Sequence, residues 1–206
     1  MSALIAEMLG KDVSRETSAK LEQFAEILIG ENQVQNLISK STEADLWGRH
    51  FADAAQLIAY APEGASWIDI GSGAGLPGLV IAILTGAPVT LVEPRRLRAE
   101  FLSRASAELG LSNVSVLQAK GEAVPRARYG AITARAVASV DRLFAMTAHL
   151  SHGGTIWVLP KGRSAKSELD DARKSWQGAF RLEPSRTDPD ARILIASGVR
   201  RVGKGR

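Results

Sequence analysis

A glycine-rich turn between two apolar segments constrains this chain most. Trp67–Ile70 is a short run typical of a β-strand, and Gly71-Ser72-Gly73-Ala74-Gly75 follows it directly. Glycine adopts positive φ without strain and leaves no Cβ in the way of a ligand. Pro77, two residues further on, suits the first turn of a helix. The segment predicts a strand, a tight turn open to a ligand, and a helix.

After residue 66, short β-rich runs alternate with helical patterns. The expected strands are 67–70, 89–92, 114–117, 131–133 and 155–159, and the expected helices are 77–86, 95–109 and 139–150. Parallel neighbouring strands need a crossover of this kind. Phe180–Ser185 and Arg192–Ala196 flank the turn Thr187-Asp188-Pro189-Asp190, which indicates an antiparallel hairpin. We expect an α/β fold with a mostly parallel, doubly wound sheet and a C-terminal hairpin.

The segment before the alternation reads as helical. Ser14 is a plausible N-cap, and Leu21, Phe24, Ala25, Leu28 and Ile29 follow it at helical spacing. Glu31-Asn32-Gln33 is expected to end that helix, and a second one is expected from Ser41-Thr42. We expect residues 1–62 to be a helical extension packed on the core, and residues 63–206 to be one compact ligand-binding domain.

The composition excludes several kinds of chemistry. The chain has 206 residues, enough for one well-buried α/β domain, and no cysteine. Disulfides, thiolate zinc sites and cysteine nucleophiles are therefore excluded. Neither a signal peptide, a membrane span nor a metal-ligand cluster is evident. We expect a cytoplasmic monomer that has no membrane partner and binds no metal.

The chain is mildly basic, with a formal charge of +4. Arg and Lys gather at 95–98, 161–163 and 200–206. Such clusters suit a phosphate backbone, although many proteins simply solvate them. The residues expected to contact nucleic acid are Arg49, Arg95, Arg96, Lys161 and Arg163.

Two cofactors compete for the glycine turn. Gly73–Gly78 fits the dinucleotide fingerprint, whereas the segment from Asp69 fits the acid-x-Gly-x-Gly-x-Gly pattern of S-adenosylmethionine methyltransferases. The second is better supported, because Asp69 would oppose a pyrophosphate but suits the ammonium group of the methionine moiety. Glu93, at the end of the next strand, can accept both ribose hydroxyls. A tight turn without a ligand is the remaining alternative.

Other strand ends supply further candidates. Gly121-Glu122 follows the third strand, where a methyltransferase holds adenine. Arg135 ends the fourth strand next to the sulfonium, and Lys161 follows the fifth. Ligands bind beyond the carboxyl ends of such strands, so these points and Glu93 are expected to share one cleft. A structural salt bridge from Arg135 to Asp69 or Glu93 is the alternative.

The acceptor is inferred partly by exclusion. Thr133–Ala138 lacks the Asn/Asp-Pro-Pro-aromatic sequence of many amino-N methyltransferases, and C5 methylation of cytosine needs a cysteine. Guanine N7 carries a free lone pair, so its attack needs alignment and donors rather than a base. This permits an N7 acceptor, but O-methylation and small-molecule acceptors stay open.

Several fragments together resemble one family. They are Asn36-Leu37-Ile38-Ser39, Trp47–Asp53, Asp69–Leu79, Glu93-Pro94, Thr133–Ala138 and Lys161-Gly162. From about residue 21 to 162 the chain is similar in order and spacing to the glucose-inhibited division protein B family, bacterial enzymes with a Rossmann-like class I methyltransferase fold. The resemblance implies methylation of N7 of guanine 527, in RNA numbering, in the decoding-region loop of 16S rRNA. The substrate would be the small ribosomal subunit or its precursor.

The resemblance also implies roles for individual residues. It implies cofactor contacts at Gly71, Gly73, Leu76, Glu93, Gly121, Glu122 and Arg135, to which the glycine-turn pattern adds Asp69 and Gly75. Catalytic roles are expected at Arg135, Lys161, Asn36 and His50. Asn36 could equally serve its own loop, and a lone His on an apolar helix face is more often a packed residue. Ala119–Ala123 departs from the family pattern by one carboxylate, and the segment after Lys161 matches only loosely. A small-molecule methyltransferase and a non-catalytic RNA-binding module remain alternatives.

Overall fold

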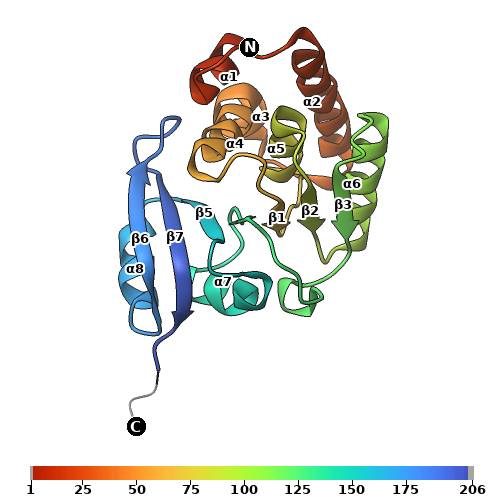
Figure 1. The fold of residues 1–206 in the computed structure, drawn as a ribbon. Coiled ribbons are helices and arrows are strands. Elements are labelled where there is room, and N and C mark those ends of the chain that lie inside the picture. Colours follow the sequence, from red (N-terminus) through yellow and green to blue (C-terminus); the bar gives the residue numbers. More distant parts are fainter. Residues whose placement is uncertain (1, 204–206) are drawn as a thin grey trace.

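A seven-stranded sheet forms the centre of the molecule (Figure 1). The computed structural model describes residues 2–203. The strands run in the order β3-β2-β1-β4-β5-β7-β6, and the first five are parallel. Their bounds are β1 Trp67–Ile70, β2 Val89–Val92, β3 Val114–Leu117, β4 Ala131–Thr133, β5 Ile156–Lys161, β6 Trp176–Pro184 and β7 Arg192–Arg201. The predicted α/β fold with a mostly parallel sheet is confirmed.

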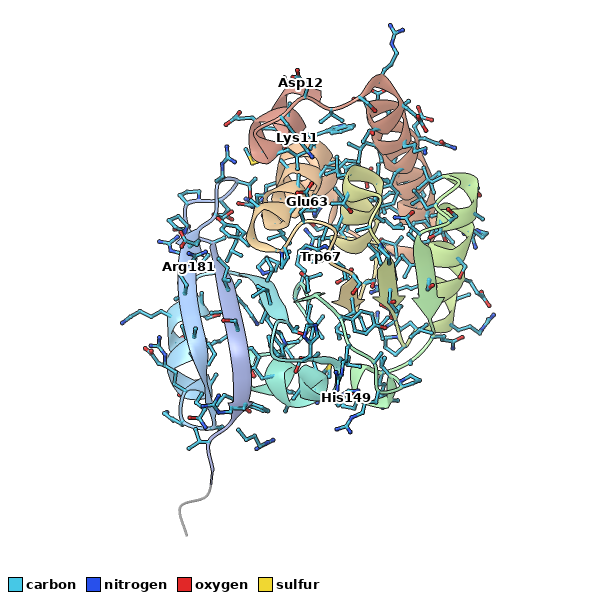
Figure 2. All side chains as sticks on the ribbon, in the orientation of Figure 1. Lys11, Asp12, Glu63, Trp67, His149 and Arg181 are labelled. Atoms are coloured by element: carbon cyan, nitrogen blue, oxygen red, sulfur yellow. The ribbon has the colours of Figure 1, made fainter. Side chains whose placement is uncertain are left out.

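The C-terminal hairpin is longer than the sequence suggested. Strand β7 pairs antiparallel with β5 on one side and with β6 on the other. Strand β5 pairs with β7 only as far as Ser197, and β7 continues to Arg201 by pairing with Gln177 and Trp176 of β6, which also begins earlier than expected. Trp67 at the start of β1 lies inside the molecule, whereas the side chain of Arg181 projects from β6 (Figure 2).

Helices cover both faces of the sheet. On one face, α5 (Gly78–Thr85) and α6 (Arg96–Glu108) share a buried cluster with the N-terminal helices. On the other, α7 (Val140–Thr147), the 3-10 turn η4 (Ala148–Leu150) and α8 (Ala165–Ala172) form a second cluster. Strand β1 serves both clusters, since Trp67 packs in the first and Ile68 in the second. Alternating side chains of a buried strand produce this division.

The N-terminal helix α2 begins as expected and ends later. It covers Arg15–Gln35, after α1 (Ser2–Leu9), and the Ser14 side chain accepts a hydrogen bond from the Thr17 backbone N–H. The expected stop at Asn32 was wrong, because Asn32 is buried and its amide serves the following loop. Its Oδ1 accepts from Ile38 N at 2.9 Å and its Nδ2 donates to Glu43. The helix ends instead at Asn36, which adopts a left-handed conformation with φ of 49°.

The segment after α2 is broken into short turns rather than one helix. It contains α3 (Lys40–Glu43), the π-helical turn η1 (Trp47–Ala52), α4 (Asp53–Ala55) and the 3-10 turn η2 (Gln56–Tyr60). Phe51 is fully buried and stacks on Phe24 of α2 at 5.3 Å between ring centroids. π-Helical turns recur at functional sites because they redirect side chains. Here the turn carries Arg49 and His50.

None of the helices within residues 2–203 has the length and apolar character needed to cross a bilayer. Of the predicted basic C-terminal cluster, Lys204, Gly205 and Arg206 lie outside the described residues.

Replacing Asn32 by alanine should destabilise the protein. The Ile38 N–H would lose its acceptor in a buried position, so we expect the free energy of unfolding to fall by about 1–3 kcal/mol. Urea unfolding followed by circular dichroism measures this loss. The matched control is Gln33→Ala, at an exposed position on the same helix, with a change within about 0.5 kcal/mol. Equal losses in the two variants would contradict the role assigned to Asn32.

Candidate active site

The glycine turn after β1 has the backbone conformation that its sequence predicts. Gly71, Gly73 and Gly75 all have positive φ, at 70°, 53° and 82°. A Cβ on Gly71 would lie 2.6 Å from a methyl group of Val137, which comes from the loop after β4. The turn is therefore closely covered at Gly71, whereas a Cβ on Gly73 would meet nothing nearer than 3.8 Å.

Asp69 lies below this turn and is completely buried. Its Oδ2 accepts a hydrogen bond from Gly78 N at 3.1 Å, which ties the start of α5 to β1. Its Oδ1 has no hydrogen-bond partner among residues 2–203. Burial raises the pKa of Asp69 to about 7, against the lowering effect of the Gly78 hydrogen bond. A buried carboxylate oxygen without a donor is a group that a cationic ligand can satisfy.

Glu93, just after β2, holds the other side of the turn. Its Oε2 accepts from Gly73 N at 3.0 Å and its Oε1 accepts from Arg95 N at 2.9 Å. The carboxylate therefore sets the distance between the glycine turn and the start of α6. Each of its oxygens retains a further lone pair, as the expected bond to ribose hydroxyls requires.

The turn after β3 packs against α7, one of the helices on the other face of the sheet. Gly121–Ala123 forms the 3-10 turn η3, and a Cβ on Gly121 would collide with Met146 of α7. Glu122, in contrast, is exposed. The predicted adenine contacts Gly121 and Glu122 thus differ in surroundings, the first packed and the second facing solvent.

A cleft of about 700 Å³ opens between the N-terminal segment and the C-terminal end of the sheet. Its polar lining comprises Ser39, Thr42, Arg49, His50, Asp53, Arg135, Lys161, Glu168, Ser185, Thr187, Asp188 and Arg192. Arg135 and Lys161 line it as expected, but Glu93 and Gly121 do not. The expectation of one shared cleft was therefore wrong for those two; Val137, which lines the cleft, packs over Gly71 of the glycine turn.

Arg135 projects into the cleft from the end of β4. Its Nη1 lies 2.9 Å from His50 Nδ1 and 3.8 Å from Asp53 Oδ2. Burial lowers the pKa of the Arg135 guanidinium, and the charges of Asp53 and Asp69 raise it in part. The short side-chain contact of Arg135 in the described residues is thus with His50, and the salt bridge is with Asp53 rather than with Asp69 or Glu93.

His50 is buried and bonded at both ring nitrogens. Its Nε2 lies 3.0 Å from Thr42 Oγ1, opposite the contact with Arg135. Burial, followed by the positive charges of Arg135 and Arg49, lowers the pKa of His50 to about 4. The imidazole is therefore neutral near pH 7.

Lys161 supports the loop between β4 and α7. Its Nζ donates to the Ala138 carbonyl oxygen at 2.6 Å and to Glu168 Oε2 at 3.0 Å, and Glu168 also accepts from Val140 N. Ala136 in this loop has φ of 55°, a conformation that alanine rarely adopts. A strained loop persists only where its surroundings hold it. Lys161 and Glu168 do so by hydrogen bonds to the backbone of Ala138 and Val140, on either side of Ser139.

The remaining predicted catalytic and RNA-binding residues lie at the surface, whereas the predicted cofactor contact Leu76 is buried. Asn36 is exposed at the end of α2 and is not among the residues that line the cleft. Arg49 forms an ion pair with Asp188 at 3.1 Å, and Arg96 pairs with Glu100 on its own helix. Arg163 pairs with Asp190, and Arg95 is exposed just before α6. Only Arg49 of these surface cations belongs to the cleft.

Sequence reasoning missed the residues that join the two walls of the cleft. Gln56 is buried and donates to Ser185 and Thr187 in the turn between β6 and β7. Asp53 accepts from Thr187 at 2.8 Å. The spacing of His50 and Asp53, three residues apart on a helical segment, was the available signal for Asp53. No local pattern pointed to Gln56.

Arg192 is the other missed residue. It begins β7 and lines the cleft. Within the part of the chain that the structure describes, its guanidinium donates only to backbone carbonyl oxygens, those of Pro189 and Ala191. Its charge is thus available to an anion in the cleft.

The sheet order, the antiparallel β7 and the acid-preceded glycine turn define a class I methyltransferase. Solved structures share this fold: the glycopeptide N-methyltransferase MtfA, complexed with sinefungin, has a TM-score of 0.61 at 13% identity, over 72% of this chain and 93% of that one. An S-adenosylmethionine-dependent methyltransferase from Aquifex aeolicus has a TM-score of 0.60 at 13% identity, over 81% and 96%. At these identities the likeness shows the fold alone.

Comparison of sequences then identifies the family. Residues 17–183 match the family model described as GidB, rRNA small subunit methyltransferase G. Proteins named ribosomal RNA small subunit methyltransferase G are 48% identical in Sphingopyxis alaskensis, over 90% of this chain and 80% of that one, and 45% identical in Zymomonas mobilis, over 91% and 88%. This chain belongs to the rRNA small subunit methyltransferase G family, which confirms the predicted family.

Replacing Glu168 by glutamine should weaken the loop after β4. The ammonium of Lys161 would keep the Ala138 carbonyl but lose its carboxylate, so we expect a loss of about 1–2 kcal/mol at pH 7. Hydrogen bonds from Ser164, Lys161 and Val140 outweigh burial and lower the pKa of Glu168. The stability they provide is present above the unfolded-state pKa and is lost as pH falls through the folded-state pKa.

The difference between wild type and Glu168→Gln should therefore be largest at pH 7 and shrink below about pH 4.5. Urea unfolding at pH 7 and pH 4 measures it. Asp170→Asn, on an exposed position of the same helix, is the control and should change stability little at either pH. A difference that stays constant with pH would show that the Glu168 carboxylate is not responsible.

Proposed function

We propose that this chain transfers a methyl group from S-adenosylmethionine to N7 of a guanine in 16S rRNA, guanine 527 in RNA numbering. Family membership supports the reaction class and the RNA. The observation that carries the rest is the cleft: it holds Arg135 and Lys161 at the carboxyl ends of β4 and β5, and its lining residue Val137 packs against Gly71 of the glycine turn. The acceptor would lie in this cleft and the cofactor at the turn.

The residues around the turn fit the cofactor. The unpaired Oδ1 of Asp69 suits the ammonium group of the methionine moiety, directly or through water, and Glu93 suits the ribose. The predicted contacts at Gly71, Gly73, Gly75, Leu76, Gly121, Glu122 and Arg135 complete the set. S-adenosylmethionine supplies an electrophilic methyl group bound to a sulfonium. The protein's part is to bind it, exclude water and align the acceptor.

An N7 acceptor fits the groups in the cleft. The N7 lone pair attacks without losing a proton, so no general base is needed. His50, the one imidazole of the cleft, has its Nδ1 engaged by Arg135. Arg135, Lys161 and Arg192 can donate to guanine O6 or to phosphate. Asp53, Glu168 and Asp188 supply negative charge that offsets the cation formed on the product ring.

The expected RNA contacts extend outward from the cleft. Arg49 and Lys161 line it, and Arg163 is exposed nearby in sequence. Arg95 and Arg96 lie on the other side of the glycine turn, at the start of α6. Such surface cations position a phosphate backbone without reading its sequence. We propose that the substrate is the small ribosomal subunit or its precursor, met in the cytoplasm by a monomer of this chain.

A small-molecule acceptor is the second candidate. A volume of about 700 Å³ falls within the range of small-ligand sites as well as of a single nucleotide. This alternative predicts turnover on a low-molecular-weight acceptor and none on ribosomal particles. A non-catalytic RNA-binding module would bind no S-adenosylmethionine, and the unpaired buried Asp69 argues against it, since an orphaned carboxylate is costly without a ligand.

The reaction is tested on small ribosomal subunits that lack the modification. They are incubated with the protein and radiolabelled S-adenosylmethionine, and the RNA is digested to nucleosides. We expect label in 7-methylguanosine. Absence of label from RNA, with cofactor binding still seen by calorimetry, would favour the small-molecule acceptor instead.

Replacing Arg135 by alanine should remove most of this activity. The cleft would lose a donor at the end of β4, and we expect the rate to fall by about 100-fold. Circular dichroism checks that the variant is folded. The control is Arg181→Ala on the exposed edge strand β6, which should keep wild-type activity (Figure 2). Full activity of Arg135→Ala would overturn the assignment of the acceptor side.

Cofactor affinity should weaken as the pH falls below 7. Asp69 has a pKa of about 7 because it is buried, and only its ionised form attracts the ammonium group. Between pH 7 and pH 5.5 we therefore expect the affinity for S-adenosylmethionine to drop by about tenfold, measured by calorimetry. Asp69→Asn keeps an oxygen for Gly78 N but has no charge to titrate. Its affinity should be lower and independent of pH over this range, and a wild-type slope in this variant would exclude Asp69 as the titrating group.

A further inference from the structure

His50 lies inside a chain of hydrogen bonds that runs from the cleft into the N-terminal segment. Arg135 Nη1 is 2.9 Å from His50 Nδ1, and His50 Nε2 is 3.0 Å from Thr42 Oγ1. Thr42 Oγ1 is in turn 3.0 Å from the Ser39 carbonyl oxygen. The imidazole is 8% exposed, so these partners rather than water decide where its proton lies.

Two separate constraints give the same tautomer. A guanidinium only donates hydrogen bonds, so the Nδ1 that faces Arg135 must carry a lone pair. The surroundings of Thr42 agree with this: its hydroxyl can donate to the Ser39 carbonyl oxygen, which only accepts, and Thr42 Oγ1, also 2.9 Å from Ser39 Oγ, then accepts from His50 Nε2–H. The histidine is therefore neutral, with its proton on Nε2.

We propose that His50 is a positioning residue for Arg135: as the neutral Nε2–H tautomer it holds the guanidinium in the wall of the cleft through Nδ1. This inference rests on the proposed function, in which Arg135 contacts the acceptor. It also replaces the direct catalytic role expected for His50, because its only lone pair in the ring plane is already used by Arg135.

The guanidinium needs such a partner. Asp53 Oδ2 is 3.8 Å away, which is too long for a hydrogen bond, and the Arg135 side chain remains 24% exposed. A free arginine side chain samples many rotamers, so one short, directional hydrogen bond restricts it strongly. The imidazole is fixed at its far side by Thr42, so it transmits the position of the N-terminal segment to the cleft.

The surrounding charges keep this arrangement at physiological pH. Burial opposes an imidazolium most, and the charges of Arg135, in the loop after β4, and Arg49, on the same turn as His50, oppose it further; Asp45 favours it, and Asp53 lies beyond Arg135. A second ring proton would also bring Nδ1–H against Nη1–H, two donors face to face. Protonation of His50 therefore releases Arg135.

The tautomer is tested directly by nitrogen-15 NMR of the wild-type protein at pH 7. We expect the His50 ring to show a protonated Nε2 and an unprotonated Nδ1, assigned by loss of the signal in His50→Asn. The chain has three histidines, so the assignment is tractable. An imidazolium at pH 7, or a proton on Nδ1, would overturn the proposal. This measurement needs no methyl acceptor, so its outcome is independent of whether the proposed function is correct.

Two substitutions separate positioning from packing. In His50→Asn the side-chain oxygen lies as many bonds from Cβ as Nδ1 does and can still accept from Arg135. His50→Gln instead reaches the position of Nε2 and Thr42. We expect kcat for methyl transfer to ribosomal particles to stay within about threefold in His50→Asn and to fall by about 30-fold or more in His50→Gln, with KM for S-adenosylmethionine unchanged in both.

Thermal unfolding monitors the fold of each variant. Equal losses of kcat in the two variants would indicate that His50 only fills space. Full activity in His50→Gln would show that Arg135 needs no hydrogen-bond acceptor at the position of Nδ1. Either result overturns the proposal. If wild-type protein methylates no RNA at all, the proposed function fails, while the NMR experiment still decides which nitrogen faces Arg135.

Discussion

The burial of one carboxylate at the end of the central strand governs how this molecule can work. Asp69 lies on β1, between β2 and β4, and its Oδ2 receives the first free N–H of α5 from Gly78. A buried carboxylate is stable only if its oxygens accept hydrogen bonds or meet a positive charge. Here Oδ2 has a hydrogen-bond donor, whereas Oδ1 has none among the described residues. The glycine turn lies directly above. The same residue thus fixes the helix to the sheet through one oxygen and presents a second, unpartnered oxygen below the glycine turn, where the proposed cofactor would place its ammonium group.

The cleft depends on a different feature, a set of hydrogen bonds between segments far apart in sequence. The cleft wall on one side is η1 and its neighbours, and on the other it is the turn between β6 and β7. Gln56 joins them by bonds in both directions: it donates to Ser185 and Thr187 and accepts from Arg186 N. The N-terminal segment and the terminal hairpin therefore hold one cleft between them, although neither contains the cofactor turn.

This division explains what the sequence could and could not predict. Local signals predicted all five parallel strands, because each is a short β-rich run bounded by turn residues, and the spacing of Asp69, Gly71 and Glu93 placed them at the glycine turn and at the end of the next strand. The broken helix around Trp47–Ala52 was not predictable from periodicity, since its π-helical turn is stabilised by burial of Phe51 against Phe24. Gln56 and Arg192 were missed for a related reason: their roles arise from partners more than a hundred residues away or from a cleft that exists only in the fold.

The charges of the cleft lead to a final consequence for the reaction. Arg49, Lys161 and Arg135 are each matched by a carboxylate, Asp188, Glu168 and Asp53 respectively, and Arg192 is the cation bonded only to carbonyl groups among the described lining residues. A site that methylates N7 turns a neutral ring into a cation, and unmatched positive charge beside the ring would oppose that step. Pairing removes this penalty while leaving N–H donors in place. The arrangement is consistent with the proposed acceptor, which gains positive charge, provided that the charge of Arg192 is balanced by a phosphate of the bound nucleotide.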